Sequence, residues 1–501
     1  MTAAKAYERL IQRYKKISLL TSCSSVLRWD ERTYMPKGAA RLRSEQLALL
    51  TGLAHEQYVA PELGELLAQI EGTALLSDPL SVPAVNVREI RRLYERRQRL
   101  PQRLVQELAR VTSLAQAVWA EARAASDFSL FRPHLEEILT LVREEAQALA
   151  ADGGPLYDAL LDEFEPGQTS ANLTALFTAL RDGLVPLIRA VAESARHPDT
   201  TILQGHFPID RQEAFGRDVS RAMGFDFYRG RLDVTVHPFC VGIGPGDTRM
   251  TTRYDPASFT QAFFAILHET GHGLYNQGLD DNHTGTPMGQ PVSLSIHESQ
   301  SRLWENFVGR SRPFWEHVLP GAKEAFPEAL GSVSVDALYG AVNELQPRFI
   351  RVDADEASYN MHILLRFEIE QALLAGDLSA RDLPGAWNEA FQCYFGMTPP
   401  DDARGCLQDV HWSAGLIGYF PTYFLGNLYA AQIYAQAQEE LGTTFQGGNF
   451  SDLREWLERR VFQHGKRYRT DELVEVVSGK PPSHQPLIDY LQRKYGEIYG
   501  I

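Results

Sequence analysis

Apolar residues recur at three- and four-residue spacing through almost every segment from Ala4 to about Arg196. This period places apolar side chains on one face of a helix, and Pro and Gly end or interrupt helices. The breaks between the segments fall near Pro36-Lys37-Gly38, Pro61, Pro83, Pro101 and Gly153-Gly154-Pro155. The N-terminal part of the chain is therefore predicted to be an array of helices.

The pattern changes between Asp226 and Tyr254. The sequence RLDVTVHPFCVGIGPGDTRMTTRY is rich in Val and Thr with alternating polarity, and glycines and Pro245 lie in its middle. This pattern predicts a β-hairpin or a small sheet, the only clear one in the chain. Its edge could pair with an extended peptide, but a purely structural hairpin fits the same residues.

Composition excludes several classes of protein. The chain has 501 residues, of which 44% are hydrophobic and 23% charged, as in a globular protein with a large core. Its net charge of −15 argues against a nucleic-acid partner. No apolar run approaches the ~18 residues that a membrane span needs. Four cysteines without C-x-x-C spacing, and an amphipathic start that does not resemble a signal peptide, favour a cytoplasmic setting.

A metal-binding pattern lies between Ala262 and Leu274, which read AFFAILHETGHGL. We expect a helix capped at Asp255-Pro256 and ending at Asn276-Gln277-Gly278. His268 and His272 then lie one turn apart on one face, where two imidazoles can hold one zinc ion, and Glu269 can reach a water beside it. The alternative is a pair of polar histidines in a buried interface, although Gly271 and Gly273 indicate close approach of another group.

A third zinc ligand has to come from another segment. A second helix is expected from about Ser293 to Gly309, and Glu298 in it is the candidate. His297 is a rival ligand on a different face of that helix. Ser295 and Glu298 also have the spacing of a capping box, in which the glutamate only binds the start of the helix.

Three further segments carry charged or polar side chains. Arg351–Glu370 is expected to be a helix whose charges lie on a solvated face. Arg88–Arg103 is read as a solvated basic face partly paired with Glu89 and Glu95. Gly405–Asn427 is rich in Gly, His and Tyr, which can be core residues or can stabilise an oxyanion.

Six short motifs, in this order, resemble the M32 family of metallocarboxypeptidases, the carboxypeptidase Taq type. They are HPF at His237–Phe239, D-x-R-x-T at Asp247–Thr251, HETGH at His268–His272, HESQS at His297–Ser301, IRVDADE at Ile350–Glu356 and GCLQDVHW at Gly405–Trp412. The resemblance extends over the whole chain.

The resemblance implies a mainly α, saddle-like gluzincin fold of the neurolysin and angiotensin-converting-enzyme type, with a deep groove and one small sheet beside the metal helix. It implies one peptidase domain over residues 1–501. Within it, residues 4–196 would form a wall and lid, 226–254 the sheet, 255–430 the catalytic metal region and 431–501 the last helices. It also implies one zinc ion per chain, replaceable by cobalt, a homodimer, and removal of C-terminal residues with broad specificity that disfavours proline.

Matched to the family's motifs, His268, His272 and Glu298 would bind the metal and Glu269 would be the general base. His411 and Tyr423, twelve residues apart, have a spacing similar to the transition-state-binding pair of neurolysin-like enzymes, with Tyr419 as the rival tyrosine. The match favours Glu298 over His297 and over the capping box.

Recognition of the substrate's C-terminal carboxylate would need a guanidinium. Arg351 is the first candidate and Arg249, beside Asp247 in its motif, the second, while His237 would help close one end of the groove. The Glu298 helix has Arg302 where other gluzincins carry Asp, so the partner of the metal histidines is open between Asp355 and Glu305. The alternatives to a carboxypeptidase are an oligoendopeptidase of the same fold and an inactive helical scaffold.

Overall fold

The computed structural model describes residues 1–151, 153–442 and 444–501. The chain divides into two compact units, each built from three separate stretches of sequence. Unit 1 comprises Met1–Gln98, Asp199–Val342 and Tyr429–Pro482, and unit 2 comprises Arg99–Pro198, Asn343–Leu428 and Ser483–Ile501. The expected internal divisions at residues 196 and 430 remain predictions. The single peptidase domain remains a prediction.

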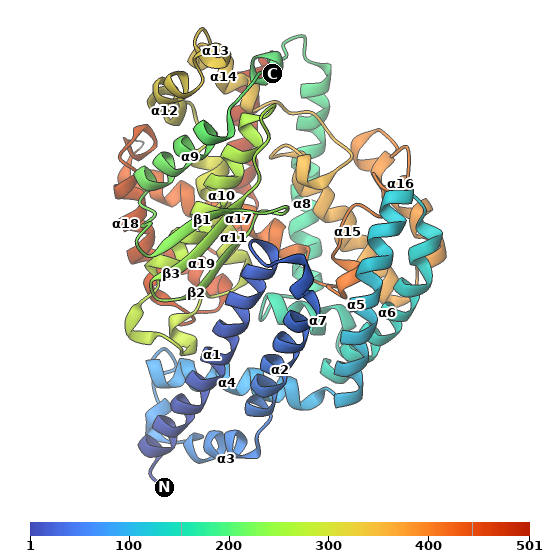
Figure 1. Cartoon of the computed structure of the whole chain (residues 1–501), viewed down its shortest axis with the longest axis vertical. Helices are drawn as coiled ribbons and strands as arrows, with labels where there is room; N and C mark the ends of the chain where they lie inside the picture. Colours follow the sequence, from blue (N-terminus) through green and yellow to red (C-terminus); the bar gives the residue numbers. More distant parts are fainter. Residues whose placement is uncertain (152, 443) are drawn as a thin grey trace. The chain divides into compact units, whose positions relative to one another are not determined.

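Unit 1 holds most of the helices and the sheet (Figure 1). Its α- and π-helices are α1 (Ala3–Arg32), α2 (Ala40–Tyr58), α3 (Pro61–Ile70), α4 (Val82–Arg99), α9 (Ile209–Met223), α10 (Phe259–Gly278), α11 (Leu294–Arg302), the π-helix η6 (Leu303–Val308), α12 (Arg312–Ala325), α13 (Pro327–Leu330), α14 (Val335–Val342), α18 (Phe450–Arg460) and α19 (Thr470–Ser478). Its 3₁₀ turns are η1 (Lys37–Ala39), η2 (Ala74–Leu76), η3 (Thr200–Leu203), η4 (Asp281–His283), η5 (Pro287–Gly289), η10 (Thr444–Gly447) and η11 (Phe462–His464).

Within its described residues, unit 2 contains helices and irregular segments but no strand. Its helices are α5 (Gln102–Ala125), α6 (Phe128–Leu149), α7 (Leu156–Phe164), α8 (Ser170–Glu193), α15 (Ser358–Ala375), α16 (Leu383–Phe395) and α20 (Gln485–Tyr499), with 3₁₀ turns η7 (Arg351–Asp353), η8 (Ala380–Asp382) and η9 (Trp412–Ala414). Helix α17 (Pro421–Leu441) starts in unit 2 and continues into unit 1.

The sheet has the strand order β1-β3-β2, with β1 (Gly230–Val234), β2 (Cys240–Gly244) and β3 (Asp247–Thr252). Strand β3 is parallel to β1 and antiparallel to β2 across the turn at Gly244–Asp247. The small sheet predicted for residues 226–254 is confirmed, and it is a mixed sheet in which β2 is an edge strand. It lies beside α10 (Figure 1).

The helical array predicted from Ala4 to Arg196 is confirmed as α1 to α8. The expected breaks hold, because α3 and α4 begin at or beside Pro61 and Pro83, and α5 begins directly after Pro101. Periodicity succeeds here because each helix buries one stripe, as α3 does with Leu63, Leu66, Leu67 and Ile70. The mainly helical class with one small sheet is confirmed, whereas the saddle-like outline and the groove remain predictions.

Two local expectations about α10 had different outcomes. The helix ends at Gly278 as predicted, but it begins at Phe259, with Ser258 at the N-cap, rather than at Asp255-Pro256. The Asp255 carboxylate instead accepts from the Ala257 amide, closing a short turn before the helix. An Asp-Pro pair favours such a turn as well as a helix start, so the sequence alone did not separate the two.

Candidate metal centre

Helices α10 and α11 approach each other backbone to backbone at Gly271. A Cβ atom built on Gly271 would lie 2.5 Å from the Gln300 carbonyl oxygen and 2.7 Å from Ser301 Cα. Only glycine fits this crossing. The contact brings the face of α10 that carries His268 and His272 against the face of α11 that carries Glu298.

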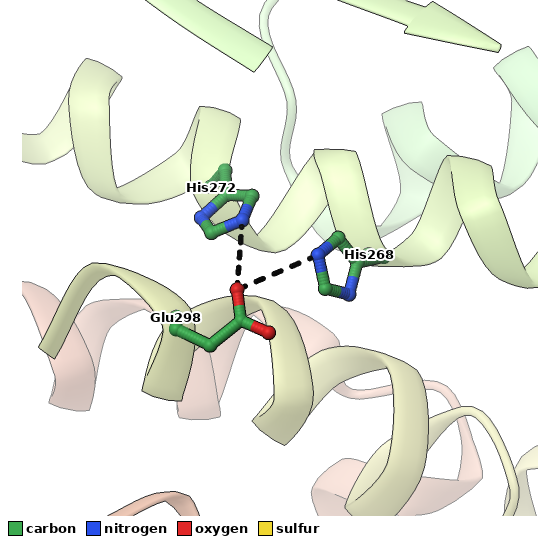
Figure 2. Close-up of side chains that lie close together, drawn as sticks. All are labelled: His268, His272 and Glu298. Carbon is green, nitrogen blue, oxygen red and sulfur yellow. Dashed lines mark ion pairs between the residues drawn. The ribbon is translucent and has the colours of Figure 1, made fainter. Parts of the chain in front are cut away.

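The three predicted ligands converge on one point (Figure 2). Glu298 Oε2 lies 3.6 Å from His268 Nε2 and 3.4 Å from His272 Nε2, and one ligand atom from each residue lies within 4.8 Å of the others. Donors bound tetrahedrally at zinc distances lie about 3.4 Å apart. The donor set and its spacing therefore fit a zinc-sized divalent cation.

His268 is oriented by Glu305, one of the two carboxylates considered from the sequence. Its Nδ1 lies 2.8 Å from Glu305 Oε2 and donates to it, which leaves the Nε2 lone pair directed at the metal position. Glu305 comes from the π-helix η6, a rare local structure that is frequent at functional sites. Asp355, the other candidate, binds the start of α15 through Ala357 and Ser358.

Arg302 stands where other gluzincins carry Asp, and it connects the two carboxylates. Its Nε donates to Glu298 Oε1 at 2.8 Å and its Nη1 to Glu305 Oε2 at 3.2 Å. Burial alone raises the pKa of Glu298, but Arg302 and the histidines outweigh it and hold that pKa well below its usual range. Glu298 is therefore ionised, and its Oε2 remains directed at the histidines.

His272 is oriented by a chain of two side chains. Asn276 donates through Nδ2 to Cys240 Sγ at 3.7 Å, so its Oδ1 faces His297 Nε2 at 3.1 Å. Since His297 Nε2 then carries the proton, its Nδ1 accepts from His272 Nδ1, 2.6 Å away. His272 Nε2 is left as a lone pair facing Glu298.

These contacts bear on the alternatives left open for α11. His297 faces the Nδ1 side of His272, away from the metal position, and thus contacts a predicted ligand rather than adding one. The capping-box alternative is wrong, because the N-cap is Ser293, whose hydroxyl accepts from the Ile296 amide. Glu298 lies too far along the helix to bind its start.

Glu269 is buried beside the three ligands. Only 5% of its surface is exposed, and its Oε2 has no hydrogen-bond partner within residues 1–151, 153–442 and 444–501. Burial raises the pKa of this carboxyl. A buried polar atom without a protein partner marks a position for water or substrate.

A second cluster of charged side chains lies in unit 2 and was misjudged from the sequence. Asp409 Oδ1 accepts from Arg351 at 2.7 Å, and its Oδ2 accepts from Arg366 Nε at 2.7 Å. Arg351 is 6% exposed, and Arg366 and Glu370 are fully buried. The expectation of a solvated face for residues 351–370 is therefore wrong: α15 is buried nearly all round, Glu368 is exposed, and Arg366 and Glu370 make their polar contacts inside unit 2.

His411, Tyr419 and Tyr423 gather beside that cluster. His411 Nε2 lies 3.4 Å from the Tyr423 hydroxyl, and the Tyr419 ring is 5.4 Å from both the His411 and the Tyr423 rings. Tyr423 also lies over the Arg351 guanidinium at 5.1 Å. Burial lowers the pKa of His411 to about 4, so the ring is neutral at pH 7 and donates one hydrogen bond.

The remaining predicted substrate residues lie in or beside the sheet of unit 1. Arg249 makes two parallel hydrogen bonds of 2.8 Å to Asp247 and lies 4.2 Å over the Trp29 ring of α1. His237 is exposed between β1 and β2. Arg249 is thus already engaged by a carboxylate of its own strand.

The basic segment on α4 is less solvated than predicted. Glu89 is only 3% exposed and pairs with Arg88 at 2.8 Å. Arg88 also donates to the Lys466 and Arg467 carbonyls. These contacts attach α4 to the segment before α19. The exposed part of the segment pairs as expected, through Arg91 and Glu95.

Sequence reasoning missed Asn276, Asp409, Arg366 and Glu370. Asp409 stood inside the GCLQDVHW motif and Asn276 at the predicted end of the metal helix, so position marked both. Nothing in the sequence distinguished the buried charges of α15 from a solvated face.

Comparison with known proteins was made by family, by sequence and by structure. A family model described as carboxypeptidase Taq (M32) metallopeptidase matches residues 9–495. The thermostable carboxypeptidase 1 of Thermus thermophilus is 46% identical over 511 residues and is covered completely, as is this chain. Carboxypeptidase 1 of Bacillus subtilis is 38% identical over 489 residues, which cover 97% of each chain.

Among solved structures, the crystal structure of the M32 carboxypeptidase from Deinococcus radiodurans superposes with a TM-score of 0.95 at 40% identity. The match covers 99% of this chain and 100% of that one. The fold described above is therefore shared with that structure. None of the helices in the described residues has both the length and the apolar character required to cross a membrane.

Proposed function

The chain belongs to the carboxypeptidase Taq (M32) metallopeptidase family, and from that premise we propose a zinc-dependent enzyme that removes C-terminal residues from peptides. The proposal includes broad specificity that disfavours proline. Its main support is the convergence of His268, His272 and Glu298, at the donor spacing of one bound cation, beside the unpaired carboxylate oxygen of Glu269.

In this proposal the three ligand side chains hold the metal through His268 Nε2, His272 Nε2 and Glu298 Oε2. A divalent metal held there would supply Lewis acidity, which lowers the pKa of water to about 7 and polarises a carbonyl oxygen. The Glu269 Oε2 atom accepts one proton from the water that attacks the carbonyl carbon. As the C–N bond breaks, it passes that proton to the departing amine.

We assign the remaining roles to unit 2. His411, neutral at pH 7, and the Tyr423 hydroxyl donate to the oxyanion that forms at the scissile carbonyl, with Tyr419 as the alternative donor. Arg351 recognises the C-terminal carboxylate of the substrate. Asp409 and Tyr359 hold its guanidinium in place, which fixes the direction of its donors before substrate binds.

The proposed setting follows the family resemblance and the composition. We propose one zinc ion per chain, replaceable by cobalt, a homodimer, and a cytoplasmic location. The acidic net charge of −15 is consistent with peptide substrates and with no nucleic-acid partner.

The decisive experiment measures metal content and then peptide cleavage in the same preparation. One metal ion per chain, with stepwise loss of residues from a peptide with a free C-terminus and none from its amidated twin, is the expected result. Cleavage of both peptides would make the protein an oligoendopeptidase. Absence of metal and of cleavage, even after zinc or cobalt is added, would leave the inactive scaffold.

A separate variant tests the third ligand. Glu298→Ala removes the only carboxylate that lies within ligand distance of both histidines among the described residues, so zinc should be lost on dialysis. Retention of one tightly held zinc ion by Glu298→Ala would assign the third position to another group.

A further inference from the structure

Glu370 is a fully buried carboxylate that the proposed chemistry does not use. Its Oε1 accepts from the Trp412 indole Nε1 at 2.9 Å, and its Oε2 accepts from the Tyr157 hydroxyl at 2.9 Å and the Gly418 amide at 3.0 Å. Three donors from two separate parts of unit 2 thus converge on one side chain of α15. Burying a carboxylate costs free energy, so a fully buried carboxylate is a candidate for a functional role.

Two of the three donors lie at the two ends of one segment. Trp412 directly follows His411, and Gly418 directly precedes Tyr419. We propose that Glu370 is a positioning residue that fixes both ends of the 411–419 segment and so places His411 and Tyr419 for the reaction. This inference rests on the proposed function, because it assigns Glu370 a role only through those two side chains.

Within the segment, the Gly415 amide donates to the Trp412 carbonyl and the Leu416 amide to the His411 carbonyl, which shapes the η9 turn without connecting either end of the segment to α15. Gly418 has a φ of +86°, and a Cβ there would lie 3.1 Å from the Leu161 amide nitrogen of α7. Its amide therefore points at Glu370 in a backbone conformation that other residues adopt only with strain. On the opposite side, Tyr157 is fixed by edge contact with Phe367 at 5.5 Å, which leaves its hydroxyl directed at the carboxylate.

The charge of Glu370 gives the proposal a measurable signature. Burial raises its pKa to about 7, while the Gly418, Trp412 and Tyr157 donors and the Arg366 charge on the same helix act in the lowering direction. The ionised carboxylate accepts from all three donors. Protonation places a hydrogen on an oxygen that already faces a donor, and so weakens the attachment of the segment.

The first test compares two isosteric changes on one helix. Glu370→Gln replaces one oxygen by a donor that faces other donors, whereas Glu368→Gln makes the same change at an exposed position two residues away. For Glu370→Gln we expect kcat/KM to fall by about ten- to a hundredfold above pH 7, mostly through kcat, with metal content unchanged. Glu368→Gln should match the wild type.

The second test reads the segment without any substrate. In the wild type, emission from Trp412 should change with a midpoint near pH 7, and this change should be missing in Glu370→Gln and in Trp412→Phe. Tyr157→Phe keeps Glu370 but removes a donor that favours its ionised form. The midpoint of the fluorescence change in Tyr157→Phe should therefore move to higher pH.

The proposal is overturned if Glu370→Gln retains the wild-type kcat/KM across the pH range. If that variant fails to fold, an unshifted midpoint in Tyr157→Phe overturns it instead. Failure of the proposed function gives a different result. A wild type that cleaves no peptide contradicts the proposed function, whereas the fluorescence midpoint tests the attachment of the 411–419 segment by Glu370 independently of cleavage.

Discussion

The metal centre of unit 1 has more carboxylates than guanidiniums, whereas the arginine cluster of unit 2 has more guanidiniums than carboxylates. Around His268 and His272, the carboxylates Glu269, Glu298 and Glu305 outnumber the guanidiniums that pair with them, Arg302 and Arg310. Around Asp409, the guanidiniums of Arg351 and Arg366 outnumber the carboxylate. The first region therefore suits a bound cation and the second a bound anion, such as the terminal carboxylate of a peptide.

Replacing Glu269 should have the largest effect. Glu269→Gln keeps the shape of the side chain but removes the oxygen that takes the proton, so turnover should fall by about 10²- to 10⁴-fold while metal content stays at the wild-type value. The measurement is kcat on a peptide with a free C-terminus, alongside metal analysis. Exposed Glu324 of α12 provides the control, Glu324→Gln. Near-normal turnover in Glu269→Gln would remove Glu269 from its assigned role.

Removing the charge of Asp409 should destabilise unit 2. Burial alone raises the pKa of Asp409, but Arg351 and Arg366 outweigh it and hold that pKa well below its usual value. Asp409→Asn leaves two buried guanidiniums without their shared carboxylate, which should cost about 3–5 kcal/mol of the free energy of unfolding at pH 7. Urea unfolding measures this loss.

The pairing of Asp409 with Arg351 and Arg366 also fixes the direction in which pH changes the free energy of unfolding. A carboxyl whose folded-state pKa is depressed contributes stability above its unfolded pKa of about 3.9, and this contribution is lost as the pH falls below that value. The difference between wild type and Asp409→Asn should therefore shrink in acid. Asp377→Asn, at an exposed position of unit 2 just after α15, is the control and should leave unfolding unchanged. A difference that grew in acid would contradict the pairing.

The contrast between the two regions also explains which parts were predictable. His268 and His272 are four residues apart on one helix, and the residue types name the chemistry, so local spacing was sufficient. Glu305 was one of two candidates, since the sequence does not show that a π-helix directs it at His268. Asn276 was missed because its role depends on a contact with Cys240 that only the folded sheet creates.

The arginine cluster was harder to predict because periodicity reports apolar faces and not the fate of charges. Arg366 lies on a helix that is buried nearly all round. In the sequence, a charged residue on such a helix cannot be distinguished from one on a solvated face. Its partner Asp409 is 43 residues away, with α16 between them. The motif contained Asp409, but only the packing of α15 shows that its carboxylate pairs with two arginines.

Removing the side chain that orients His272 should lower metal affinity by an intermediate amount. His297→Phe retains the ring that stacks on His272 at 4.5 Å but removes the Nδ1 acceptor, so metal affinity should fall by about ten- to a hundredfold. Competition with a chelator measures the affinity. His317→Phe, a ring that packs on Phe450, provides the control. Affinity equal to wild type in His297→Phe would show that the chain from Asn276 does not orient the ligand.

Arg249 should show the smallest effect, because it makes two parallel hydrogen bonds to Asp247, whereas Arg351 shares the single carboxylate of Asp409 with Arg366. The Arg249 guanidinium lies between Asp247 and the Trp29 ring, and Arg249→Lys keeps the charge while losing the parallel hydrogen bonds and part of the ring contact. We expect a loss of about 0.5–1 kcal/mol in stability and an unchanged KM. Arg351→Lys, by contrast, should raise KM for a free C-terminus, since an ammonium cannot form two parallel bonds to a carboxylate. If Arg249→Lys raises KM and Arg351→Lys does not, the anion site lies on the sheet of unit 1 and the assignment of Arg351 is wrong.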